Sequence, residues 1–170
     1  MHTTGMEQLN RTNLMQKSDN GEVQVYAALI RMLASREQSH AELSRKLLDK
    51  GFAVEAVANQ LTQARQTNIQ SDRRFAEMSL RVAFSKGHGP NRLRQKMQQH
   101  EIDNAIVIAL IDSEEYDWYD LAYSVKTRKF GESIESDWQR RQKQQRFLLG
   151  RGFTFEQINF AVSHNPALGA

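Results

Sequence analysis

The side chains that could carry out catalysis are scattered along this sequence. The histidines are His2, His40, His88, His100 and His164, and none has a histidine partner three or four residues away, as a helical metal-binding or acid–base pair would need. Cysteine is absent, which excludes disulfides, cysteine-ligated zinc and cysteine nucleophiles. No serine lies in a Gly-x-Ser-x-Gly motif. The residues give no positive evidence for an enzyme, and we expect neither catalytic residues nor a cofactor.

A dense group of carboxylates, the ligands that hard cations prefer, lies between positions 112 and 120. It consists of Asp112, Glu114, Glu115, Asp117 and Asp120. Its spacing does not fit the calcium-binding loop, which has Asp or Asn at alternate positions, a Gly and a closing Glu. Acidic residues that follow Ser113 fit the first turns of a helix better, because the helix dipole favours negative charge there. We therefore expect no metal site.

The segment Gly87–Pro90 could hold an anion, because glycines allow backbone N–H groups to approach one. It lacks the Gly-Lys-Ser/Thr ending of a nucleotide-binding loop and follows a helix pattern rather than a strand. It is more typical of a turn between helices. Lys86 and Arg92 beside it could still contact a nucleic-acid phosphate at the helix N-terminus.

Charged residues fall into blocks of alternating sign, although the formal net charge is only +3. Positions 73–100 hold seven basic residues and one acid, positions 101–120 hold seven acids and no Lys or Arg, and positions 121–151 hold eight basic residues and three acids. Such blocks favour charged partners more than the total charge does.

Thirteen basic side chains in these blocks are the candidate contacts with a partner. They are Arg73, Arg74, Lys86, Arg92, Arg94, Lys96, Arg128, Lys129, Arg140, Arg141, Lys143, Arg146 and Arg151. Around Leu93, Met97 and Phe147 they alternate with apolar residues, so we expect the charges to project outward together. They could contact phosphate or an acidic protein surface, or form solvated helix faces.

An internal repeat of about 50 residues organises the chain. A shift of 50 positions aligns Leu43, Leu47, Phe52, Val57 and Leu61 with Leu93, Met97, Ile102, Val107 and Ile111. A weaker third copy, at a shift of 101, aligns Leu47, Leu48, Gly51, Phe52, Val57 and Leu61 with Leu148, Leu149, Gly152, Phe153, Ile158 and Val162. A period of this length predicts stacked helical modules.

Each module carries three helix patterns, separated by caps and glycines. In the first module, Ser39 and Glu42 form a capping box and Gly51 ends the helix. Later helices are predicted to begin at Ser71 or Asp72, Gly89 with Pro90, Asp103, Ser113, Ser136 with Gln139, and Thr154 with Gln157. Positions 106–111 have strand propensity, but their repeat partner lies in a helical pattern, so we predict a helix there as well.

The sequence thus predicts an all-α protein built as a tandem repeat of three three-helix modules. We expect an N-terminal tail or extra helix over 1–20, modules over 21–70, 71–112 and 113–165, and a C-terminal tail over 166–170. The hydrophobic content of 39% is typical of a soluble globular protein. The apolar run at 105–111 is far short of the roughly 20 residues of a membrane-spanning helix, and positions 1–20 lack the apolar centre of a signal peptide. A cytoplasmic location is therefore expected.

Four segments of the chain carry a specific resemblance. They are Ser71–Ala76, Lys86–Leu93, Arg128–Glu132 and Gln145–Phe153. In order and spacing, over about residues 22–165, they resemble the RecX family of bacterial regulatory proteins. The sequence departs from the family pattern at Asn68 and Ile69, where members commonly carry Gly and an aromatic residue, and at Glu101, where Gly usually ends the middle helix. A positive φ is unfavourable for residues other than glycine, so these departures concern the geometry of the two turns.

The resemblance implies an elongated, curved, right-angled helical solenoid without catalytic residues. It also implies a protein of DNA repair, homologous recombination and the SOS response that binds the RecA recombinase filament on single-stranded DNA. Members similar to this one inhibit filament extension, ATP hydrolysis and strand exchange. We expect a monomer without cofactor or membrane contact that meets single-stranded DNA directly or through RecA. A stand-alone nucleic-acid-binding helical module is the alternative.

Overall fold

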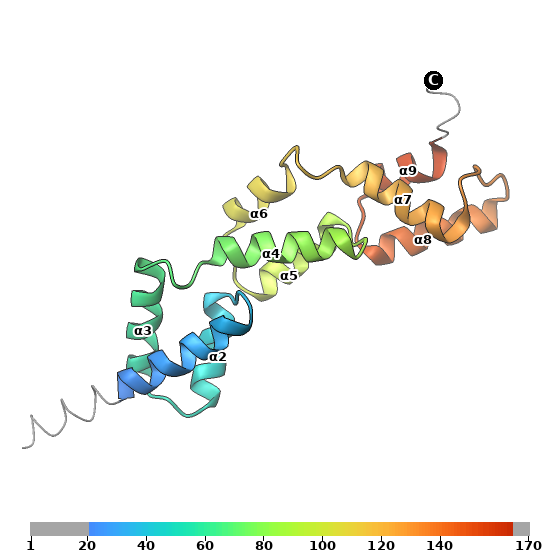
Figure 1. Ribbon diagram of the computed structural model, residues 1–170. Coiled ribbons are helices and arrows are strands. Elements are labelled where there is room, and N and C mark those ends of the chain that lie inside the picture. The colour runs from blue at the N-terminus through green and yellow to red at the C-terminus, as the bar shows by residue number, and fades with distance from the viewer. Residues whose placement is uncertain (1–20, 165–170) are drawn as a thin grey trace, which may run out of the picture. The chain divides into compact units, whose positions relative to one another are not determined.

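The computed structural model describes residues 21–164, and within this span all regular secondary structure is helical (Figure 1). The predicted all-α fold is confirmed, including the helix over positions 106–111, which belongs to α6. The predictions for positions 1–20 and 166–170 lie outside the described residues.

The first described helix covers residues 21–35. The following helices are α2 (His40–Asp49), α3 (Val54–Gln66), α4 (Asp72–Ser85), α5 (Pro90–Gln99), α6 (Asn104–Ile111), α7 (Trp118–Phe130), α8 (Trp138–Arg151) and α9 (Phe155–Ser163).

Several predicted caps are confirmed. The Ser39 hydroxyl accepts a hydrogen bond from the N–H of Glu42 at 3.1 Å, which satisfies one free donor at the start of α2. Thr154 and Gln157 form a complete capping box at α9. The Asp103 carboxylate caps α6 by accepting from the N–H of Ala105 at 2.8 Å.

Two helices begin later than predicted. Asp117, not Ser113, caps α7, and Asp137, not Ser136, caps α8. The Asp117 carboxylate accepts hydrogen bonds from two N–H groups of the first turn of α7. An ionised carboxylate that accepts two such bonds is a stronger cap than a neutral serine hydroxyl.

The first part of the acidic block, positions 112–115, therefore does not lie in the first turns of a helix. Asp112 is the C-terminal cap of α6, and Glu114 and Glu115 lie in the turn before α7. The interpretation of Glu114 and Glu115 as partners of a helix dipole was wrong. Of the block, Asp117 and Asp120 are placed at a helix start.

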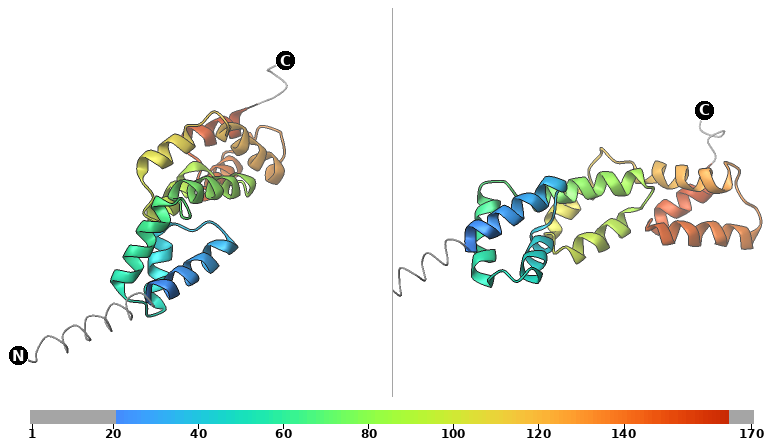
Figure 2. Two further views of the ribbon diagram at one scale, coloured as in Figure 1. Left: turned by 60° about the vertical axis from the view of Figure 1, so that its left-hand side comes forward. Right: turned by 60° about the horizontal axis from the view of Figure 1, so that its bottom comes forward.

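The chain divides into two compact units, and the boundary falls after Phe75, within α4. In the first unit, the helix at 21–35 and helices α2 and α3 enclose a core of Val25, Ala28, Leu29, Leu43, Leu47, Val57, Leu61 and Ala64. In the second unit, α7, α8 and α9 pack together around Ala122, Val125, Leu148, Phe153, Ile158, Ala161 and Val162, and these helices form the orange-to-red bundle of Figure 2. The module boundaries at 70 and 112 stay a prediction.

Side-chain burial follows the internal repeat. The equivalent positions Leu47, Met97 and Leu148 are all buried. The next repeat position is exposed in both copies that carry Leu there, by 37% at Leu48 and 48% at Leu149. Equivalent residues thus face inward or outward together, which is what a structural repeat requires.

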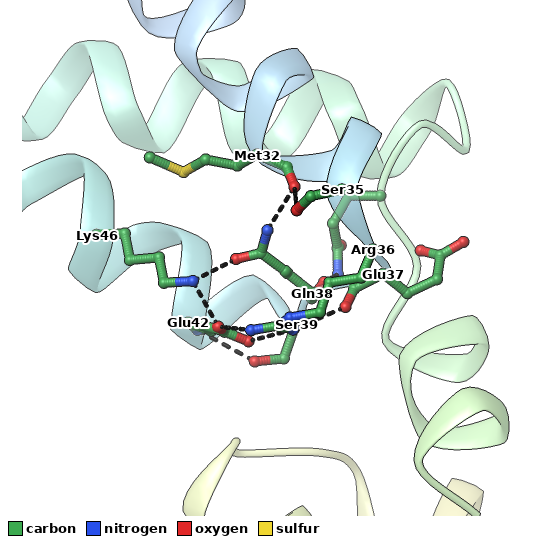
Figure 3. Close-up of polar contacts among 9 residues, drawn as sticks. Met32, Ser35, Arg36, Glu37, Gln38, Ser39, Glu42 and Lys46 are labelled. Atoms are coloured by element: carbon green, nitrogen blue, oxygen red, sulfur yellow. Dashed lines mark hydrogen bonds and ion pairs between the residues drawn. The ribbon is translucent and has the colours of Figure 1, made fainter. Parts of the chain in front are cut away.

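In the first unit, a polar network connects the 21–35 helix, the turn that follows it and α2 (Figure 3). Glu42 pairs with Arg36 and with Lys46, whose Nζ lies 2.7 Å from the carboxylate. Gln38 accepts from Lys46 at 2.7 Å and donates to the carbonyl of Met32 at 2.6 Å. Burial would raise the pKa of Glu42, but the hydrogen bonds from Arg36 and Lys46 lower it to about 2.

The turn before α4 is held by Arg74. Its Nε donates to Glu37 at 2.7 Å, Nη1 donates to the carbonyl and side-chain oxygens of Asn68, and Nη2 donates to the carbonyl of Ile69. Asn68 has φ of +59°. Asn tolerates this left-handed conformation better than most residues, and Arg74 stabilises it. The turn is therefore formed without the glycine that the family pattern leads one to expect at position 68.

Glu101 also adopts a left-handed backbone, with φ of +56°, directly after α5. The N–H of Ile102 donates to the carbonyl of Met97 at 3.0 Å, as in the helix-ending motif that normally uses glycine. Gly51 ends α2 in the same way, with φ of +86°. The geometry of the turn is thus kept at Glu101, at the energetic cost of a Cβ in a disfavoured region.

Candidate functional site

The segment Gly87–Pro90 is an interhelical turn, and its backbone donors are already used. The N–H of Gly89 donates to the carbonyl of Arg151 at 2.9 Å, and the N–H of Asn91 donates to the carbonyl of Gly152 at 2.9 Å. Pro90 has no N–H. These N–H groups at the start of α5 therefore bond to carbonyls at the end of α8 and are not available to a phosphate.

The contact between α5 and the end of α8 is too close for a side chain. A Cβ on Gly152, whose φ is +92°, would lie 2.6 Å from the Cβ of Arg92. A Cβ on Gly89 would lie 2.5 Å from the backbone of Gly152. This close approach places Arg151 beside the end of α4, where its Nη1 donates to the carbonyl of Lys86 at 3.1 Å.

A groove opens beside this contact, and we call it the α7–α8 groove. Its lining residues are Lys86, Val125, Arg128, Lys129, Phe147 and Arg151, and its volume is about 310 Å³. The Nζ of Lys129 lies 4.3 Å from the centre of the Phe147 ring, and the guanidinium of Arg151 lies 5.3 Å from it. Phe130 packs its ring edgewise against Phe147 with 5.4 Å between centroids. Aromatic and cation–π contacts therefore hold two of the four cations in place.

A second groove, the α4–α5 groove, shares Lys86 with the first. It has a volume of about 210 Å³ and is lined by Ser79, Val82, Ala83, Lys86, His88, Arg92, Leu93 and Lys96. Burial lowers the pKa of His88, and the positive charges of Arg92, Arg151 and Lys86 lower it further. The three cations that add to the effect of burial on this pKa lie where the two grooves meet.

Among residues 21–164, no Asp or Glu lines either groove. In the first unit, by contrast, Arg36 and Lys46 pair with Glu42, and Arg74 pairs with Glu37. Lys86, Arg128, Lys129 and Arg151 form no ion pair within residues 21–164. Their charge is available to an anionic partner.

The structure separates some cations that were expected to act together. Arg92 and Lys96 are four residues apart and line one groove, whereas Arg94 lies about 200° around the helix from Arg92 and donates to Asn91 at 2.9 Å. Arg74 is engaged by the internal acceptors described above, and we leave it out of the site. Arg73 is exposed on α4.

The basic residues early in α8 lie elsewhere in the second unit. Arg146 borders a separate hollow with Trp138, which is 72% exposed, Gln139 and Gln142. Arg141 donates to the hydroxyl of Ser163 at 2.8 Å. The remaining two, Arg140 and Lys143, are exposed. None of these four lines the α7–α8 groove.

Sequence reasoning missed two residues of this region. Phe147 was named only as an apolar residue among cations, yet it packs against the core of α7, α8 and α9 and forms the floor of the α7–α8 groove. Lys126 was counted as one more surface charge, but it is fully buried and donates to the carbonyls of Glu132 and Ser133 at 3.2 and 3.0 Å. Burial lowers its pKa, although the Glu132 carboxylate acts in the opposite direction. Nothing in the local pattern distinguishes Lys126 from its exposed neighbours.

Across residues 21–164, no three His, Asp or Glu side chains gather closely enough to hold a metal ion. The helices of the same span are also too short or too polar to cross a bilayer.

Two family models match the chain in the regions just described. One is the third three-helix domain of RecX, at residues 115–162, and the other is the second three-helix domain of RecX, at residues 71–109. The Regulatory protein RecX of Legionella pneumophila is 35% identical over 134 residues, which cover 79% of this chain and 89% of that protein. The chain belongs to the RecX family.

Other RecX relatives agree with this assignment. The Regulatory protein RecX of Vibrio vulnificus is 34% identical, with 79% of this chain and 88% of that protein covered. The one from Acinetobacter baylyi is 37% identical, with 77% and 81% covered. RecX regulatory proteins are non-enzymatic, in agreement with the absence of a catalytic motif from the sequence.

Solved RecX structures share the fold. The crystal structure of RecX from Lactobacillus salivarius matches with a TM-score of 0.72 at 15% identity, over 85% of this chain and 96% of that one. A second crystal structure of a regulatory protein RecX matches with a TM-score of 0.75 at 18% identity, over 91% and 78%. The three-helix domains of the RecX fold are thus present in this chain.

Proposed function

We propose that this RecX chain binds the RecA recombinase filament on single-stranded DNA and inhibits its extension, ATP hydrolysis and strand exchange. The proposal is supported by the similarity to RecX regulatory proteins over about 79% of the chain. It assigns the protein to the control of homologous recombination and DNA repair, including the SOS response. Because such filaments form on DNA in the bacterial cytoplasm, the proposal also assigns the protein to the cytoplasm. The proposed active form is a monomer.

The observation that carries the proposal is the set of cations in the two grooves of the second unit, where no acidic residue of the described part of the chain is among the lining residues. A filament of protein on DNA is rich in phosphate and carboxylate groups, so a surface where Lys86, Arg128, Lys129 and Arg151 line one groove is drawn to it. Exposed charges of this kind contribute little to folding but much to the rate and orientation of encounter.

A stand-alone nucleic-acid-binding role is the second candidate, because the same grooves would attract a bare phosphate backbone. The two candidates differ in their response to salt. Binding through phosphates alone falls steeply between low and moderate salt as counterions are released, whereas a contact that includes protein surface persists in part.

The test is to titrate the purified protein into RecA filaments already assembled on single-stranded DNA and to follow ATP hydrolysis. A fall in the rate of ATP hydrolysis as more protein is added supports the proposal. The ratio of added protein to RecA at which the rate falls separates the modes of action. A fall at amounts well below RecA indicates action at filament ends, and a fall only near saturation indicates coating of the filament. Unchanged hydrolysis at saturating protein, with binding to bare single-stranded DNA retained, would favour the second candidate.

A further inference from the structure

The α7–α8 groove combines a charged rim with an apolar floor. Lys86, Arg128 and Lys129 are exposed at the rim, while Val125 is buried and Phe147 is half-buried at the floor. A ligand that fills this groove meets positive charge at its edges and hydrocarbon at its centre.

We propose that the α7–α8 groove receives an acidic peptide segment that carries one apolar side chain, supplied by the protein partner. The carboxylates would pair with the rim cations, and the apolar side chain would be buried against Val125 and Phe147. The inference rests on the proposed function for the identity of that partner, but its chemistry comes from the groove alone.

The floor favours a peptide over a nucleic-acid strand. Bases bind proteins chiefly by stacking on open aromatic faces. Here the ring of Phe147 is engaged by Lys129 at 4.3 Å and by Arg151 at 5.3 Å, and its neighbour Phe130 packs against it edgewise. The groove therefore offers a base no free aromatic platform, and a sugar–phosphate backbone gains nothing from the apolar floor.

Arg151 is positioned in advance for a carboxylate. Its Nη1 is anchored on the carbonyl of Lys86, and its guanidinium packs near Phe147. An anchored guanidinium loses less side-chain entropy when it binds, and its planar fork matches the two oxygens of a carboxylate. Such preorganisation favours a directed ion pair over diffuse attraction.

The experiment measures binding by fluorescence anisotropy with the full chain and labelled probes, without RecA. The first probe is a short peptide of Asp, Glu and Gly with one central Leu. The second replaces that Leu with Ala, and the third is an oligothymidylate of equal charge. We expect the Leu peptide to bind about tenfold or more tightly than either other probe, because the burial of one Leu side chain is worth roughly that factor.

Two groove variants and one control separate binding from folding. Lys86→Glu with Lys129→Glu reverses the rim charge and should abolish peptide binding. Lys86→Met with Lys129→Met removes the charge but keeps the packing on Phe147, so it should weaken binding without changing helicity. The control, Arg45→Glu with Arg65→Glu, makes the same charge change at exposed sites of the first unit and should bind the peptide as the wild type does.

Three results would overturn the inference: equal binding of the Leu and Ala peptides, tighter binding of the oligothymidylate, or full binding by both groove variants. The outcome is independent of the proposed function, because no RecA is present. A protein that inhibits RecA but ignores the peptide disproves this inference alone. A protein that binds the peptide but leaves RecA unaffected disproves the proposed function alone.

Discussion

The carbonyl of Gly152, at the end of α8, accepts a hydrogen bond at 2.9 Å from the N–H of Asn91, in the first turn of α5. Together with the bond from the N–H of Gly89 to the carbonyl of Arg151, it joins α5 to the end of α8 through backbone atoms. The proposed binding grooves lie on either side of Lys86, next to this junction. The junction therefore determines where the cations of the grooves lie.

Gly152→Ala should destabilise the protein by about 2–4 kcal/mol, because a Cβ there meets the backbone of Arg92 and the left-handed φ is disfavoured for alanine. Urea unfolding measures the loss. Gly150→Ala is the matched control, since a Cβ at this position within α8 meets nothing within 4 Å. It should be neutral or stabilising by up to about 1 kcal/mol. Equal effects of the two substitutions would contradict the close packing.

Glu101→Gly should stabilise the protein by about 0.5–1.5 kcal/mol, because glycine adopts the φ of +56° without steric cost. The measurement is the midpoint of thermal unfolding. Glu101→Ala keeps the Cβ and should bring no gain. Asn68→Gly should not help either, although φ there is +59°, because it removes the side-chain oxygen that accepts from Arg74. A gain from Ala equal to that from Gly would disprove the explanation.

Lys126→Met should cost about 1–3 kcal/mol, because the carbonyls of Glu132 and Ser133 lose their donor. The loop at positions 131–137 should also become more sensitive to limited proteolysis. Lys129→Met, the same change at an exposed site, should alter stability by no more than about 1 kcal/mol through the lost cation–π contact. Proteolysis of both variants at the wild-type rate would refute the anchoring role of Lys126.

Glu42 should make the free energy of unfolding depend on pH in the acidic range. Its pKa in the folded protein is about 2, below the ordinary value of 4.5, so its contribution is full above pH 4.5 and is lost as the pH falls toward 2. Glu42→Gln should lower the free energy of unfolding at neutral pH by about 1–3 kcal/mol, discounted because the Arg36 and Lys46 side chains are each 44% exposed. The difference between variant and wild type should shrink at pH 3. A constant difference across this range would contradict the network in Figure 3.

The helices could be predicted from the sequence because local signals coincide with the repeat. Leu43 and Leu93 occupy equivalent positions and are both buried, and Thr154 with Gln157 caps α9 as expected. The start of α7 was misplaced because Ser113 and Asp117 are both acceptable caps. The choice between them depends on tertiary contacts such as the bond from the Trp118 indole to the carbonyl of Ile111.

The candidate site was only partly predictable. Clustering in the sequence identified Lys86, Arg128, Lys129 and Arg151, but not that they surround a single groove. The floor at Phe147 depends on the packing of α7 against α8, which has no local signature. In the sequence Arg74 resembles its basic neighbours, yet in the structure it donates to Glu37 and to the carbonyl of Asn68. Acceptors that lie elsewhere in the sequence thus determine which cations remain available to a partner.

The most direct test of the central claim is the rate of ATP hydrolysis by RecA filaments on single-stranded DNA, measured at increasing amounts of three proteins. The wild type should inhibit in proportion to dose. Lys86→Glu with Arg128→Glu, verified as helical by circular dichroism, should require at least about tenfold more protein for the same inhibition. Arg45→Glu with Arg65→Glu should match the wild type. The account would be contradicted if the wild type left hydrolysis unchanged, or if the groove variant inhibited as well as the wild type.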